Sequence, residues 1–74
     1  MPEKDYKKIL RRLSMENLRT MLNMIEKNKV PLSVKLQYSS LVLDAGEVSL
    51  SVSDLVELKA IEDAIHEVLL YEKI

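Results

Sequence analysis

His66 is the sole histidine of this 74-residue chain, and acidic residues surround it: Glu62 and Asp63 lie one helical turn before it and Glu67 beside it. On a helix, Asp63 and His66 would place a carboxylate and an imidazole on one face, which is half of a metal site. The chain has no cysteine and no second histidine to complete such a site. We therefore interpret His66 as a solvated surface histidine and expect neither a metal nor another cofactor.

Serine hydroxyls are a second source of chemistry, because an adjacent base can convert them into nucleophiles. The serines of the middle segment are Ser33, Ser39, Ser40, Ser49, Ser51 and Ser53. None of them stands in a strained GxSxG turn, and the single histidine belongs to a different predicted element. The sequence therefore predicts a protein that is not an enzyme.

The charge distribution indicates a basic surface near the N-terminus. Residues 1–29 carry eight Lys or Arg against four Asp or Glu, whereas residues 30–74 carry three against eight, so the two parts have net charges of +4 and −5. The basic cluster consists of Lys4, Lys7, Lys8, Arg11, Arg12 and Arg19. Such a cluster could contact phosphates, but single-strand binding usually adds aromatic platforms, and this chain has three Tyr and no Phe or Trp. We favour attraction between the basic first part and the acidic last helix.

The N-terminal third has the apolar spacing of helices. One stripe consists of Tyr6, Ile9, Leu10 and Leu13, and a second stripe of Leu18, Met21, Leu22 and Ile25. Because the two stripes are out of phase, we expect one helix over about residues 3–13 and another over about 15–28, with Ser14 as the N-cap and Leu13 and Leu18 as a hydrophobic staple. A single kinked helix over 3–28 stays open.

Residues 32–53 alternate apolar and polar side chains, which predicts a β-hairpin. A loop of Asp44, Ala45 and Gly46, with Gly46 in the left-handed conformation, would pair Leu43 with Glu47, and further along Val42 with Val48, Ser40 with Leu50 and Tyr38 with Val52. The alternative is a helix from Pro31 to Ala45 ended by Gly46, which would make the protein an all-α bundle of three or four helices. We favour the hairpin because the helical arrangement leaves a poor apolar stripe.

The last segment predicts a helix over about residues 54–73, with Ser53 as the N-cap and acidic residues in the first turn. Its apolar stripe consists of Leu55, Leu58, Ile61, Ile65, Val68 and Leu69. The whole chain is therefore expected to be one α+β domain over residues 1–74, in the order α, α, β, β, α, with helices covering a central hairpin.

Such a short chain is expected to self-associate, because it buries only roughly 60% of its unfolded surface and a two-stranded hairpin is marginal alone. The longer first strand would leave residues 32–36 unpaired, and Leu41 and Leu43 would face away from the helices. The candidate interface residues are Leu32, Val34, Leu36, Leu41 and Leu43. These features favour a non-catalytic homo-oligomer that acts as an adaptor, regulator or structural subunit and contacts another protein; nucleic-acid binding by the basic cluster is the alternative. The charged N-terminus and the lack of an apolar run of about 18 residues predict a cytoplasmic protein without a membrane span.

Overall fold

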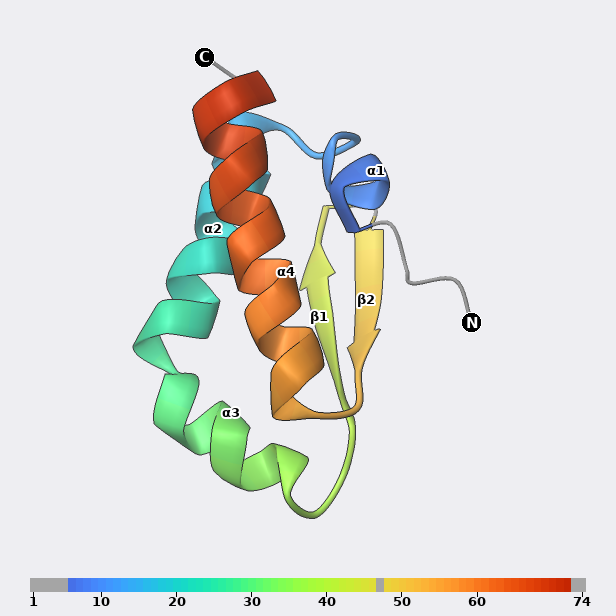
Figure 1. Ribbon diagram of the computed structural model, residues 1–74, viewed down its shortest axis with the longest axis vertical. Coiled ribbons are helices and arrows are strands. Elements are labelled where there is room, and N and C mark those ends of the chain that lie inside the picture. The colour runs from blue at the N-terminus through green and yellow to red at the C-terminus, as the bar shows by residue number, and fades with distance from the viewer. Residues whose placement is uncertain (1–5, 47, 73–74) are drawn as a thin grey trace.

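The computed structural model describes residues 6–46 and 48–72 (Figure 1). Its elements are α1 (Tyr6–Leu10), α2 (Met15–Lys27), α3 (Lys29–Leu36), β1 (Leu41–Ala45), β2 (Val48–Val52), α4 (Leu55–Glu67) and a π-helical continuation, η1 (Val68–Glu72). The two strands form one antiparallel hairpin. The predicted α+β class and the hairpin are therefore confirmed.

The break between α1 and α2 lies where the change of apolar phase predicts it. The Ser14 Oγ accepts a hydrogen bond from the Asn17 N–H at 3.1 Å, which satisfies one of the amide groups that open α2. Leu13 and Leu18, on the two sides of this cap, are both buried. The predicted start of the first helix near residue 3 lies outside the described residues.

The segment predicted as the first half of a long strand is instead α3. Only Asn28 separates it from α2, and the Asn28 carbonyl accepts from the Leu32 N–H at 2.8 Å to start the new helix. Pro31 lies in the first turn of α3, where its missing N–H removes no intrahelical bond. Leu32 and Leu36 are four residues apart, so the helix places both against the core.

The strands pair in a different register from the one predicted. Leu41 lies opposite Val52, Leu43 opposite Leu50 and Ala45 opposite Val48, so that residues 46–47 connect the strands. Gly46 has a φ of 58°, which confirms its predicted left-handed conformation. The predicted pairs of Val42 with Val48, Ser40 with Leu50 and Tyr38 with Val52 are wrong, and Glu47, the predicted partner of Leu43, lies outside the described residues. The observed register turns the odd-numbered residues of β1 inward, and Leu41, Leu43 and Ala45 are buried together with Leu50 and Val52.

Helices α2 and α4 pack against each other and against the hairpin (Figure 1). The largest fully buried side chains of this core are Leu10, Leu18, Met21, Ile25, Leu43, Val52, Leu58, Ile61, Ile65 and Val68. On the outer face of the hairpin, Val42, Asp44, Ser49 and Ser51 are exposed. The molecule therefore has one core, with α3 at its edge.

The cap of α4 lies one residue later than predicted. Asp54, not Ser53, is the N-cap, and its carboxylate accepts from the Glu57 N–H at 2.8 Å. The Glu57 carboxylate in turn accepts from the Ser53 N–H at 3.2 Å, so two backbone donors at this helix start are satisfied reciprocally. Across residues 6–46 and 48–72, no helix combines the length and the apolar character that crossing a membrane requires.

Candidate interaction surface

The five predicted interface residues lie in different environments. Leu41 and Leu43 are 6% and 1% exposed, so the prediction that they face away from the helices is wrong; the shifted hairpin register directs them into the core. Leu32 and Leu36 are partly buried and pack against the core from α3. Val34 is 50% exposed and is the member of this set that offers most of its surface to a partner.

The other side of α3 carries an exposed apolar ridge, which we call the outer α3 face: Val30, Val34 and Tyr38. These residues are 75%, 50% and 83% exposed. They are spaced four apart along the helix and the turn that follows it, where the Tyr38 N–H donates to the Lys35 carbonyl at 3.0 Å. Positions two apart on a helix differ by about 200°, so this ridge lies opposite Leu32 and Leu36. Sequence reasoning missed it because it assigned the segment to a strand.

Helix α3 is therefore apolar on two opposite faces, although none of its residues, all of which the structure describes, is fully buried. A helix at the surface of a single domain normally carries one apolar face, directed at the core. The start of α4 lies at the same end of the molecule as α3 (Figure 1), and its Leu55 and Val56 are also exposed. Other exposed apolar residues lie elsewhere, at Met15, Val42, Leu70 and Tyr71, and scattered ones are ordinary. A contiguous ridge such as the outer α3 face is typical of an interaction surface.

The basic cluster is partly paired within the chain. Lys7 forms an ion pair with Glu67 of α4, which is the predicted attraction between the basic first part and the acidic last helix. Nearby, the Tyr6 hydroxyl donates to the Glu57 carboxylate at 3.0 Å. Burial, and then this hydrogen bond, raises the pKa of Tyr6 from 10.0 to about 12. Of the other members, Arg12 and Arg19 are exposed, and Lys4 lies outside the described residues.

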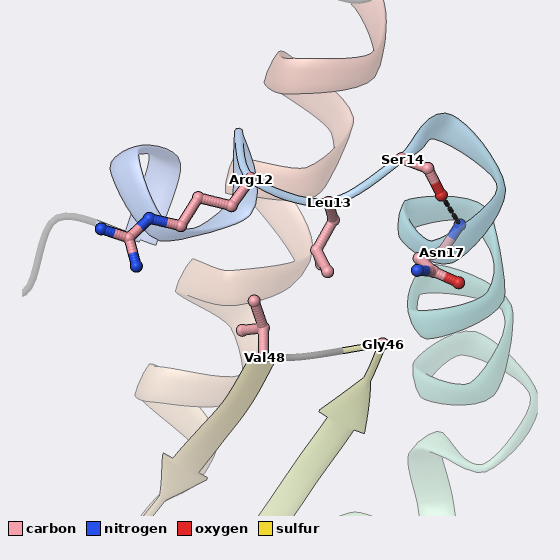
Figure 2. Close-up of a pocket in the computed structure, with 6 residues that line it drawn as sticks. All are labelled: Arg12, Leu13, Ser14, Asn17, Gly46 and Val48. Carbon is pink, nitrogen blue, oxygen red and sulfur yellow. Dashed lines mark hydrogen bonds between the residues drawn. The ribbon is translucent and has the colours of Figure 1, made fainter.

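A cavity of about 390 Å³ lies between the start of α2 and the tip of the hairpin (Figure 2). Its lining residues are Arg12, Leu13, Ser14, Asn17, Gly46 and Val48. The Ser14 hydroxyl already serves as the cap of α2, and Figure 2 shows the Arg12 side chain extending away from Ser14 and Asn17. The polar groups of this cavity therefore do not converge on one point as a catalytic site requires.

The structure also brings together three side chains of α2 and α4 that can act as metal ligands: Glu26, Glu62 and His66. Their ligand atoms all lie within 4.8 Å of one another. Asp63, which the sequence suggested as the partner of His66, does not belong to this set. The Lys29 Nζ lies 3.1 Å from one Glu62 carboxylate oxygen and 3.5 Å from the other. The spacing of Glu62 and His66 was visible in the sequence, but the approach of Glu26 from another helix was not.

Comparison with protein-family models, with curated proteins and with solved structures finds no match to this chain. The outer α3 face is a departure from what a self-contained small domain would show, because the opposite side of the same helix already packs against the core.

Proposed function

We propose that the protein is a non-catalytic interaction module that self-associates through the outer α3 face and acts as an adaptor, regulator or structural subunit. The observation that carries this proposal is the pair of opposite apolar faces on α3, of which the chain covers only one. Fully burying a valine side chain contributes about 1.5–3 kcal/mol. Covering Val30, Val34 and Tyr38 would therefore stabilise a complex substantially.

A second copy of the chain fits this surface because the ridge is self-complementary. If two α3 helices pack antiparallel about a twofold axis, Val34 meets its own counterpart and Val30 meets Tyr38 of the other copy. The ridge contains no charged residue, so this pairing buries no ion. A stable interface needs about 800 Å² from each partner, so exposed residues beyond the ridge have to contribute as well. Leu55 and Val56, at the start of α4 and at the same end of the molecule, are exposed apolar candidates (Figure 1).

The experiment measures molar mass by light scattering after size exclusion, together with the melting temperature, over a range of protein concentrations. We expect an oligomer mass and a melting temperature that rises with concentration. Val34→Lys should shift the protein to the monomer. Val42→Lys is the matched control, because Val42 is similarly exposed, at 57%, but lies on the outer face of the hairpin. A monomer at every concentration, or equal effects of the two substitutions, would contradict the proposal.

The same material tests nucleic-acid binding. Wild-type protein and a variant with Lys7, Lys8, Arg11 and Arg12 all changed to Gln are incubated with mixed-sequence DNA and RNA at physiological salt in a filter-binding assay. We expect no retention by either protein, and for the variant a modest loss of stability at low salt from pairs such as Lys7 with Glu67, at about 0–1 kcal/mol each. Salt-sensitive retention by the wild type that the variant loses would overturn the interaction-module proposal in favour of phosphate binding.

A further inference from the structure

We propose that Glu26, Glu62 and His66 form a binding site for a divalent transition-metal ion such as zinc, and that the ion ties α2 to α4. The site was not expected from the sequence, because a single histidine with carboxylates on its own helix provides too few ligands. The structure supplies the missing ligand, Glu26, from the neighbouring helix. The proposal does not depend on self-association.

The geometry of the three groups is close to that of a metal site. Glu62 and His66 are four residues apart on α4 and so share one face of that helix, and Glu26 faces them from α2, with its Oε2 3.8 Å from the His66 Nε2. Ligand atoms about 2.0–2.2 Å from a zinc ion are themselves about 3–4 Å apart. Because all three ligand atoms lie within 4.8 Å of one another, small rotations of exposed side chains are enough to close the site.

The charge balance favours a cation at this position. Glu62 is only 8% exposed in its side chain, and a buried carboxylate requires a positive partner. Lys29 supplies one ammonium group, but Glu26 and Glu62 together supply two carboxylates. A divalent ion would neutralise both, and the half-exposed Lys29 side chain could then turn toward the solvent. In the absence of metal, Lys29 acts as the counter-ion of Glu62.

The donor atoms select the class of metal. An imidazole nitrogen together with carboxylate oxygens suits zinc and the neighbouring first-row divalent ions, whereas magnesium and calcium prefer oxygen ligands alone. Three protein ligands leave at least one coordination position for water or for a donor atom of another molecule.

The test uses the full chain without a polyhistidine tag, titrated with zinc and, in parallel, with magnesium. Because His66 is the sole histidine, its ring protons form a single set of NMR signals that reports directly on coordination. We expect saturation at one zinc per chain, a shift of the His66 signals and a rise in melting temperature, with magnesium causing none of these at equal concentration.

Four single variants then assign the ligands. His66→Gln and Glu26→Gln should each lower the zinc affinity at least tenfold, since mutation even of residues that only hydrogen-bond to the ligands lowers metal affinity about 10–100-fold. Asp63→Asn is the matched control, because it removes an exposed carboxylate of α4 outside the cluster and should leave the affinity unchanged. Lys29→Gln should raise the affinity, because it removes the competing ammonium group.

Three results would overturn the proposal. The first is the absence of a specific zinc site, seen as no binding, as binding without saturation or as an equal loss in Asp63→Asn; the last two would show only diffuse attraction to an acidic helix. The second is zinc binding that leaves the His66 signals in place. The third is saturation at one zinc per two chains with a doubled mass, which would show a cross-link between copies instead of a site within the chain.

Discussion

Replacing Gly46 with alanine tests whether the hairpin connection requires a left-handed residue. Gly46 has a φ of 58° immediately after β1. A Cβ at this position would lie 2.6 Å from the Asn17 Nδ2 and 3.7 Å from a Leu13 methyl group. The substitution therefore introduces two separate costs, one in the backbone and one in a contact with α2.

The backbone cost is the larger. A residue other than glycine loses about 1–2 kcal/mol in the left-handed conformation, and a β-branched residue loses more. The contact with Asn17 involves the end of a partly exposed, flexible side chain, which can rotate away at a smaller cost. We expect Gly46→Ala to destabilise by about 1–2 kcal/mol, which corresponds to a melting-temperature loss of roughly 4–16 °C at about 4–8 °C per kcal/mol, and Gly46→Val to destabilise by more.

Thermal and urea unfolding followed by circular dichroism measures both costs. Asn17→Ala removes the contact but keeps the backbone N–H that Ser14 caps, so Gly46→Ala in that background reports the backbone cost alone. In the same background Gly46→Asn should lose less stability than Gly46→Ala, because asparagine tolerates positive φ. Equal losses for Asn and Ala, or an unchanged stability of Gly46→Ala, would refute the conformational explanation.

Three further predictions concern individual hydrogen bonds and ion pairs. Because the pKa of Tyr6 is raised from 10.0 to about 12, the contribution of the Tyr6 hydroxyl to stability is complete below pH 10 and is lost as the pH rises to 12. Tyr6→Phe should therefore flatten the alkaline part of a profile of unfolding free energy against pH, measured with urea. An unchanged alkaline slope would contradict the assignment. Lys29→Met should destabilise the metal-free protein by about 1–3 kcal/mol because the buried Glu62 carboxylate loses its cation, and an unchanged urea midpoint would show that water replaces the ammonium group. Ser14→Ala should lower the free energy of unfolding by about 0.5–2 kcal/mol in thermal melts, whereas Ser14→Asp should keep most of the wild-type stability. Equal losses in the two variants would show that the hydrogen bond from the Asn17 N–H to the Ser14 side chain contributes nothing.

The features that could be predicted from the sequence depend on neighbouring residues. Ser14 is a recognisable N-cap because the apolar phase changes across it, and Gly46 is recognisable as the single glycine between two alternating segments. Both signals are local, and the structure contains both features. The N-cap of α4 could not be assigned from local sequence alone, because Ser53 and Asp54 are both good N-cap residues. In the structure the Asp54 carboxylate accepts the capping hydrogen bond from the Glu57 N–H.

The predicted hairpin register was wrong because it depended on the length and the position of the connecting turn, which no local pattern determines. The predicted three-residue loop placed the even-numbered residues of β1 on the inner face, whereas the observed connection of residues 46–47 places Leu41, Leu43 and Ala45 there. A shift of register by an odd number of residues exchanges the two faces of a strand. The position of the turn therefore determines which side chains the core contains, and it places the predicted interface residues Leu41 and Leu43 in that core.

The three-residue metal cluster shows a different limit. The spacing of Glu62 and His66 is visible on one helix, but Glu26 is 36 positions before Glu62 in the sequence and reaches it only through the packing of α2 on α4. Lys29 likewise meets Glu62 through tertiary structure, at the start of α3 and a single residue beyond the end of α2. Such contacts depend on the angle and depth of helix packing, which are tertiary properties.

The segment that was assigned wrongly is also the one that carries the proposed function. Leu32, Val34, Leu36 and Tyr38 alternate along the chain, which suits a strand with one buried face, but in a helix the same spacing sends alternate members to opposite sides. The core covers Leu32 and Leu36, and Val34 and Tyr38 remain exposed on the other side. A helix needs only one apolar face to pack against its own domain, and the described part of the chain leaves the second face of α3 exposed. The alternating pattern that favoured a strand thus produces, once the segment is helical, an exposed apolar ridge, and our proposal of self-association rests on the outer α3 face and not on the edge of a hairpin.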